Sequence, residues 1–258
     1  MNVLNEVISL YDSIGLKEMG SVKLMNRIDT KFLLTPQSLV SCLAAHINDY
    51  DVVEINNKRI LSYFTTYYDT ENLNMYHEHH NGKNRRFKIR YREYAESGDK
   101  FLEIKLKEKG RTHKMRVAVN GFEKHINGGD QLFVNSNTPY SADDLNPVLS
   151  THFKRITLVN KATCERITID LNVGFNNLNM SKSLDNCVIV EIKRNRDDIY
   201  SSFARTIKKH GYSPLSISKY CLGTIALNND VKYNRFKPRL LSVNKLMAEE
   251  REMIALVG

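Results

Sequence analysis

Residues 85–94 read RRFKIRYREY, and this stretch decides the fold. Charged and apolar side chains alternate along it with a period of two, which is the pattern of a β-strand with two unlike faces. One face carries only cations, namely Arg86, Lys88, Arg90 and Arg92. The other face is apolar and comprises Phe87, Ile89 and Tyr91. The stretch therefore predicts a strand that packs on one side and presents positive charge on the other.

Seven further segments are compatible with strands, and most of them repeat this alternation. We expect them at about 22–34, 60–69, 100–108, 113–119, 152–160, 163–172 and 187–194. Helices are expected at 2–14, at about 36–48, 197–210 and 218–227, and at about 242–255. Long antiparallel strands in series favour a sheet that closes on itself, because closure removes exposed edges. The prediction is an α+β fold: an eight-stranded antiparallel β-barrel tunnel flanked by helices, in one domain spanning 1–258.

Positive charge is concentrated in one part of the chain. The 258 residues carry a net charge of +9, and residues 83–116 hold 13 basic and five acidic residues, which is +8 of that total. A polyanionic partner follows from this excess: nucleic acid, anionic lipid or a phosphorylated small molecule. Specific binding of nucleic acid is disfavoured because Phe87 and Tyr91 lie on the face opposite the cations, where bases could not stack beside phosphate contacts.

Composition excludes several other classes. Hydrophobic residues make up 41 % of the chain, which is a globular proportion. There is no apolar run near the roughly 18 residues needed to cross a bilayer, and residues 1–11 have no basic cluster typical of a secretory signal. The four cysteines are widely spaced and predict free thiols. We expect a cytoplasmic protein.

If helices cover the apolar faces of the strands, the charged faces point into the barrel. Buried like charges are costly without counter-anions, so a lumen of Arg and Lys predicts a bound chain of phosphates. Four acids share these basic faces: Asp29, Glu103, Asp170 and Glu191. Each is either an ion-pair partner or a ligand of a hard divalent ion that bridges phosphates. Glu191 is the first choice for a metal ligand.

The order and spacing of these motifs resemble the VTC (vacuolar transporter chaperone) domain, a polyphosphate polymerase domain of the CYTH-like superfamily of triphosphate tunnel metalloenzymes. The resemblance covers about residues 22–227. It is carried by RIDTKF at 27–32, YYDT at 67–70, NG at 81–82, RFKIRYR at 86–92, FLEIK at 101–105, RITID at 166–170, VEIK at 190–193 and SKY at 218–220.

The resemblance implies transfer of the terminal phosphate of ATP onto a growing polyphosphate chain, with a divalent metal ion (Mn²⁺ or Mg²⁺). It implies ATP and polyphosphate as partners, and it leaves open a membrane partner protein for product export. By motif position, the catalytic cations would be Lys31, Arg90, Arg92, Lys105, Arg166 and Lys193. Further phosphate-binding residues would be Lys88, Lys114, Arg116, Arg155 and Lys219. Glu191 and Glu103 would hold the metal.

The chain departs from the family pattern at three positions. Hydrolytic tunnel enzymes usually open with Glu-x-Glu-x-Lys, whereas this strand has Arg27 at the first carboxylate position. Fewer acids favour transfer over hydrolysis, although a triphosphate hydrolase and a non-catalytic binding module for polyphosphate or inositol phosphates remain alternatives. Ser216 replaces a second Lys of the closing helix, and Phe153 stands where a Tyr is common.

Two segments carry weaker signals. Residues 76–80, YHEHH, lack the spacing of a helical zinc motif, so we expect a solvated loop near the tunnel mouth. The amphipathic C-terminal segment predicts core packing, with a partner-facing or membrane-facing surface as the alternative.

Overall fold

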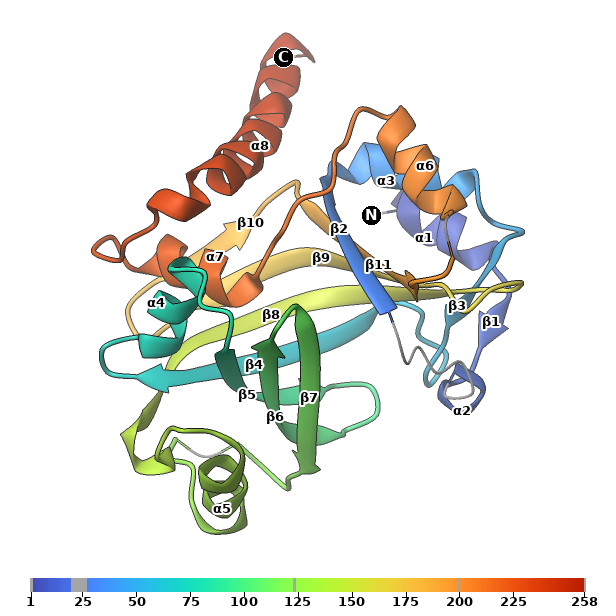
Figure 1. Ribbon diagram of the computed structural model, residues 1–258. Coiled ribbons are helices and arrows are strands. Elements are labelled where there is room, and N and C mark those ends of the chain that lie inside the picture. The colour runs from blue at the N-terminus through green and yellow to red at the C-terminus, as the bar shows by residue number, and fades with distance from the viewer. Residues whose placement is uncertain (1, 20–26, 123, 199, 258) are drawn as a thin grey trace.

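The predicted strands form one strongly curled antiparallel sheet. The computed structural model describes residues 2–19, 27–122, 124–198 and 200–257, and side chains as far as residue 248. An eight-stranded path runs through the sheet in the order β2-β11-β9-β8-β4-β5-β6-β7 (Figure 1). Its strands are β2 (Arg27–Leu34), β4 (Leu61–Thr70), β5 (Arg86–Tyr94), β6 (Lys100–Glu108), β7 (Arg111–Ala118), β8 (Leu145–Asn160), β9 (Arg166–Asn176) and β11 (Val188–Asn195). The eight-stranded antiparallel prediction is confirmed.

Three shorter strands, which no sequence pattern predicted, extend this sheet. β1 (Ser13–Ile14) pairs in parallel with β3 (Tyr50–Val53), β3 also pairs with β8, and β10 (Ser181–Leu184) pairs with β9. Each is at most four residues long, which is too short for a periodic pattern to stand out.

Helices cover the outside of the sheet, as predicted. α1 (Asn2–Ser9), α3 (Pro36–Ala44) and α6 (Ser202–Lys209) pack on the apolar faces of β2, β8, β9 and β11. α5 (Gly128–Asn137) and the 3₁₀ turn η1 (Ala142–Asp144) cover the apolar faces of β5 and β6. With these faces buried, the charged face of each strand turns inward.

A third group of helices closes one end of the curled sheet. α7 (Lys219–Leu227) lies against β8 and β9, with α4 (Asn74–His80), the 3₁₀ turn η2 (Asn234–Phe236) and α8 (Lys237–Val257) beside it. Gly223 permits this close approach, since a Cβ there would lie 2.6 Å from the ring of Phe175. α7 therefore enters the interior and places its first residue, Lys219, next to the charged strand faces.

The two end strands of the path, β2 and β7, are not paired with each other within the described residues. The segment before α7 runs along β2 instead, where the Leu215 N–H donates to the Lys31 carbonyl at 2.7 Å. Burial lowers the pKa of Lys105 on β6, and the positive charge of Lys31 lowers it further. Like charges thus face each other across this side of the curled sheet.

The N-terminal helix is shorter than predicted. It ends at Ser9 rather than at residue 14, and Ser13–Ile14 form β1. Arg59 gives the physical reason, because its guanidinium donates hydrogen bonds to the carbonyls of Ile8, Ser9 and Tyr11. These carbonyls are satisfied from outside the helix, so the chain can leave the helical path there.

Other boundaries also differ from the predictions. α8 begins at Lys237 instead of about 242, β8 begins at Leu145 instead of about 152, and α3 ends at Ala44 instead of about 48. Residues 22–26 of the first predicted strand lie outside the described residues, so that part of the prediction is not tested. Residues 76–80 are helical, not a loop: both carboxylate oxygens of Asp69 accept backbone N–H groups of α4, from Met75 and Tyr76. Asp69 lies six residues before Met75, outside the N-cap position where a capping side chain is normally sought in a sequence. Within the described part of the chain, no helix has the length and apolar character needed to span a membrane.

Candidate functional site

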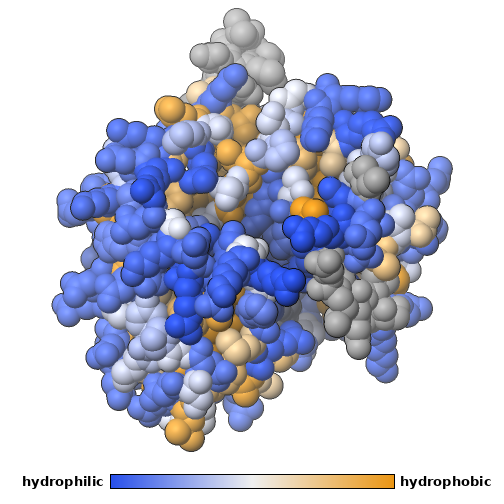
Figure 2. Space-filling view, viewed as in Figure 1, coloured by the Kyte–Doolittle hydropathy of each residue, from blue (hydrophilic) through white to orange (hydrophobic). Residues whose placement is uncertain are grey.

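Two connected cavities run through the interior of the curled sheet. The first has a volume of about 420 Å³ and the second of about 370 Å³. They share a set of lining residues: Asp29, Lys31, Lys88, Lys105, Thr112, Glu191, Ile217 and Ser218. Because the same side chains border both cavities, we treat them as one passage, hereafter the tunnel. Hydrophilic side chains also surround a hollow near the middle of the face seen in Figure 2.

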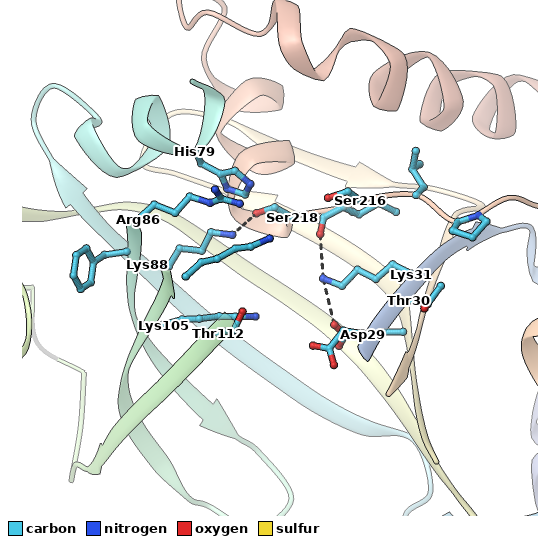
Figure 3. A pocket seen from close by; sticks show the side chains of 16 residues that line it. Asp29, Thr30, Lys31, His79, Arg86, Lys88, Lys105, Thr112, Ser216 and Ser218 are labelled. Atoms are coloured by element: carbon cyan, nitrogen blue, oxygen red, sulfur yellow. Dashed lines mark hydrogen bonds and ion pairs between the residues drawn. The ribbon is translucent and has the colours of Figure 1, made fainter. Parts of the chain in front are cut away.

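The lining of the tunnel is strongly basic. Eleven Arg and Lys side chains and only three acidic ones border the second cavity. The first cavity adds Arg86 and Lys107, and Figure 3 shows the lysines of β5, β6 and β2 reaching toward its centre. Side chains that the sequence placed on separate strands therefore meet in one space.

Eleven of the thirteen predicted site residues line the tunnel. They are Lys31, Lys88, Arg90, Arg92, Lys105, Lys114, Arg155, Arg166, Glu191, Lys193 and Lys219. The two others do not. Arg116 is exposed on β7, where its guanidinium carbon lies 4.3 Å from the ring centre of Phe101. Glu103 is 1 % exposed and lies behind the lining.

Glu103 is a buried counter-ion of two lining cations. It accepts from Arg90 Nε at 2.8 Å, approaches Arg90 Nη2 at 2.6 Å and forms an ion pair with Lys114. Burial alone would raise the pKa of Glu103, but Arg90, Arg92 and Lys114 outweigh it and lower that pKa to about 2. Glu103 thereby fixes the two cations at the tunnel wall.

Asp170 plays the same part for another pair of cations. Arg155 makes a two-point contact with it, Nε to Oδ1 at 2.5 Å and Nη2 to Oδ2 at 2.8 Å, and Lys219 from α7 also bonds to it. Burial would raise the pKa of Asp170, yet Arg155 and Lys219 hold it well below its usual range. Asp170 thus joins the sheet to the helix that closes the tunnel end.

Glu191 borders both cavities, as Asp29 does. It pairs with Lys193 at 2.6 Å and with Lys31 at 3.4 Å. Burial opposes ionisation, but Lys193 and Lys31 hold the pKa of Glu191 well below its ordinary value. The carboxylate is therefore ionised at neutral pH and borders both cavities.

Two other lining cations, Lys88 and Arg92, donate hydrogen bonds to neutral hydroxyl groups. Lys88 donates to the Ser218 hydroxyl at 2.9 Å, and Arg92 donates to the Thr65 hydroxyl at 3.1 Å. Burial, followed by Lys31 and Lys88, lowers the pKa of Lys105 to about 7. A group of cations that repel one another in this way is prepared to receive an anion.

Aromatic rings that were not among the predicted site residues hold several of these cations in place. The Arg155 guanidinium carbon lies 4.8 Å from the ring centre of Tyr63 and 5.1 Å from that of Phe153. The Arg90 guanidinium carbon lies 5.9 Å from that of Tyr67. The alternation of Leu61, Tyr63 and Tyr67 along β4 was the available signal. Phe153 uses its ring face, so a Tyr hydroxyl is not needed for this contact with Arg155.

Within the described residues, no group of three or more His, Cys, Asp or Glu side chains could hold a metal ion.

The histidines of 76–80 lie on α4, where His79 borders the first cavity and His80 is buried. Ser216, the other departure from the family pattern, also borders the first cavity.

Comparisons with known proteins agree with this architecture. The profile of the VTC domain family matches residues 26–228. The structure of a candidate adenylate cyclase from Bacillus halodurans is similar with a TM-score of 0.52 at 10 % identity, covering 75 % of this chain and 94 % of that one. A candidate adenylate cyclase from Vibrio parahaemolyticus has a TM-score of 0.45 at 12 % identity, covering 78 % and 99 %. No curated protein sequence matches the chain.

The first structural likeness concerns the fold alone, at an identity that carries no information about substrate. The sequence profile is more specific, because its match extends from β2 to the end of α7 and so includes every strand of the tunnel wall. The basic tunnel, its paired acids and this match lead to one conclusion: the chain belongs to the VTC domain family.

Proposed function

We propose that the protein is an ATP-dependent polyphosphate polymerase, which transfers the terminal phosphate of ATP onto the end of a polyphosphate chain inside the tunnel. One observation carries this proposal: eleven basic side chains and three acidic ones border the second cavity, and each of those acids is in an ion pair. A space with this charge excess requires a polyanion. A linear chain of phosphates suits cations that are distributed over two adjoining cavities.

The pairing of the acids supports transfer rather than hydrolysis. Asp29 pairs with Arg27, Asp170 with Arg155, and Glu191 with Lys193, so each lining carboxylate already has a cationic partner. Activation of water would call for a carboxylate able to accept a proton. Phosphoryl transfer to a phosphate chain needs none, because the attacking oxygen is already anionic.

The proposed reaction balances without an added base. A terminal oxygen of the polyphosphate forms a bond to the γ-phosphorus of ATP, and the bond from that phosphorus to the bridging oxygen of ADP breaks. ADP leaves with the electron pair. Arg90, Arg155 and Lys193 would neutralise the charge that gathers on the crowded phosphates. Catalysis then consists of positioning and electrostatic stabilisation.

The two ends of the tunnel differ in chemistry, which suggests a direction. Of the two cavities, only the second is bordered by Leu16, Met19, Val53, Leu61 and Tyr94. We assign the base and ribose of ATP to the end of the tunnel that these side chains border. The first cavity adds Arg86, Lys107 and the Ser216 hydroxyl group, which suit a bare phosphate chain, and Phe87, Pro214 and Leu215 also border it.

A divalent metal ion fits this site only together with the phosphates. Glu191 is the one candidate ligand of the pair Glu191 and Glu103 that borders the tunnel, since Glu103 is enclosed by Arg90 and Lys114. One carboxylate plus phosphate oxygens is a common donor set for Mg²⁺. When bound, the metal would supply charge neutralisation for the γ-phosphate. We therefore keep Glu191 as the proposed metal ligand and assign Glu103 to holding the two cations.

The proposal is tested by incubating the purified protein with ATP and Mn²⁺ and following both polyphosphate on a gel and free phosphate. We expect polymer growth in the wild type and its loss in Glu191→Gln and Arg90→Ala. Arg85→Ala is the matched control, because Arg85 pairs with Glu108 outside the tunnel lining. Free phosphate without polymer would indicate a triphosphate hydrolase. Tight triphosphate binding without turnover would indicate a binding module.

A further inference from the structure

His79 has no part in the site as proposed above, yet it borders the first cavity. It lies near the C-terminal end of α4, and Figure 3 shows its ring beside Arg86 at the edge of that cavity. Its Nδ1 atom lies 3.0 Å from the Sγ atom of Cys221 on α7. The ring also packs edge-on against Phe236, with 5.8 Å between ring centres. Contacts from two other elements thus fix its orientation.

The direction of the His79–Cys221 hydrogen bond follows from the surroundings of each group. Cys221 is 1 % exposed, and burial raises the pKa of its thiol despite nearby Lys88 and Arg86. Burial, and then the surrounding cations, lower the pKa of His79 to about 2. A protonated thiol beside a neutral imidazole donates its hydrogen to the bare ring nitrogen. Nδ1 is then the acceptor, and the ring hydrogen is on Nε2.

The charged groups around His79 come from every element that packs near it. Lys88 and Arg86 belong to β5, Lys107 to β6 and Arg239 to α8, and all four oppose a positive charge on the ring. Cys221 on α7 supplies the only proton partner of Nδ1 within the described residues. The four cations favour the neutral ring, and the Cys221 thiol favours the tautomer with its hydrogen on Nε2.

We infer that His79 is a neutral hydrogen-bond donor to the phosphate chain at the outer end of the first cavity, and that Cys221 is the positioning residue that fixes its tautomer. The inference rests on the proposed function in so far as a phosphate chain occupies this cavity. A neutral donor recognises a phosphate oxygen without adding another charge to a wall that already holds Arg86, Lys88 and Lys107. Such a contact orients the chain yet lets it move on, which a growing polymer requires.

Hydrogen bonds at the start of α7 fix the position of Cys221 relative to the tunnel wall. Its backbone N–H donates to the Ser218 hydroxyl at 3.3 Å, and that same hydroxyl accepts from Lys88 at 2.9 Å. The first turn of α7 therefore connects His79 to a lysine that borders both cavities. Replacement of the thiol should disturb the imidazole without removing any charge from the wall.

The test combines ¹⁵N NMR of the imidazole with binding of a short inorganic polyphosphate. A difference spectrum against His79→Gln assigns the signal among the eight histidines. We expect a neutral ring with the hydrogen on Nε2 from pH 5.5 to 8, and a shift of the Nε2 signal on addition of polyphosphate. In Cys221→Val, the fraction with hydrogen on Nδ1 should increase. A ring that titrates near its ordinary pKa, or an Nε2 signal that polyphosphate leaves in place, overturns the inference.

The affinity for polyphosphate distinguishes a hydrogen bond donated by His79 from a role of its ring in packing. We expect His79→Phe to raise the Kd for polyphosphate roughly threefold to tenfold, the effect of one neutral hydrogen bond. His79→Gln, whose amide N–H₂ can donate, should stay within about twofold of the wild type. Equal loss in both variants overturns the inference. None of these measurements needs turnover, so a protein that fails to polymerise but shows the expected signals refutes the proposed function alone.

Discussion

Lys105 provides a quantitative test because its protonation is coupled to anion binding. Burial and the neighbouring Lys31 and Lys88 lower its pKa to about 7. A bound phosphate would supply the opposite charge and return that pKa toward the ordinary value for lysine, about 10.4. Binding of a phosphate chain must therefore take up protons from solution at pH 8.

The size of the uptake follows from the pKa values. At pH 8 roughly one tenth of Lys105 is protonated in the free protein, so binding takes up about 0.9 proton at this residue. Lys114 and Lys219, with pKa values of about 8, add roughly 0.5 proton each. We expect about 1.9 protons per bound chain in the wild type and about 1.0 in Lys105→Gln. From Lys105 alone, the Kd should rise roughly eightfold between pH 7.5 and 8.5.

Isothermal titration calorimetry measures this uptake directly. Inorganic triphosphate is titrated at pH 8 in two buffers of different ionisation enthalpy, and the difference in heat gives the number of protons. Lys154→Gln is the matched control, because Lys154 is exposed and donates to Ser62 on the outer side of β8. The reasoning is refuted if Lys105→Gln takes up as many protons as the wild type.

The same pKa has a consequence for stability without ligand. Between about pH 7 and the ordinary lysine pKa, the unfolded chain holds a proton on Lys105 that the folded protein has released. The free energy of unfolding should therefore rise with pH through this window, and the penalty is fully present below pH 7. Urea unfolding at pH 7 and pH 9 should show a smaller difference in Lys105→Gln than in the wild type.

Three further predictions concern the tunnel wall. Gly223→Ala should lower the free energy of unfolding by about 1–3 kcal/mol in urea titrations, since the new Cβ lies 2.6 Å from Phe175 and α7 must shift. Asp170→Asn leaves Arg155 and a lysine of α7 without a counter-charge and should cost about 3 kcal/mol by the same measurement. Inorganic triphosphate should then raise the Tm of that variant more than the wild-type Tm, and an equal rise contradicts this. Tyr94→Ala should raise the KM for ATP several-fold in a turnover assay and leave the Kd of inorganic triphosphate unchanged, whereas parallel losses would argue against a nucleoside at that end.

Local sequence pattern was sufficient for most of the wall. Alternation in residues 86–92 and 101–107 predicted both the strands and the face that each cation occupies, because the side-chain period of a strand is a property of the backbone. Thr35-Pro36 marked the start of α3, and the Thr35 hydroxyl does accept from the Ser38 N–H. Such patterns depend on interactions within a few residues, so they can be interpreted without knowledge of the tertiary structure.

Contacts between distant segments escaped the same reasoning. Arg59 ends α1 from 48 residues away or more, and Lys219 on α7 reaches Asp170 on β9 from 49 residues away. Glu103 shares a face with Lys105 and Lys107 in the sequence, yet it sits behind the lining and holds Arg90. Alternation with a period of two shows on which face of a strand a side chain lies, but not how deeply it is buried below the tunnel surface. That burial decides whether a carboxylate can bind a metal ion in the tunnel or serves as a buried counter-ion.

The amino-acid sequence by itself determined that most of the eight predicted strands would carry a charged face, and that these faces would together hold a large excess of positive charge. Only the tertiary structure decided which cations share an acid and which do not. Asp170 joins Arg155 to Lys219, which lies 49 residues after Asp170 in the chain. The charges of Lys31, Lys88 and Arg90 act on Lys105, and only Glu191 opposes them among the main charges that affect its pKa. The physical reason is that ion pairing depends on distance in space within a few ångströms, and that distance is set by sheet curvature and by the approach of α7 at Gly223.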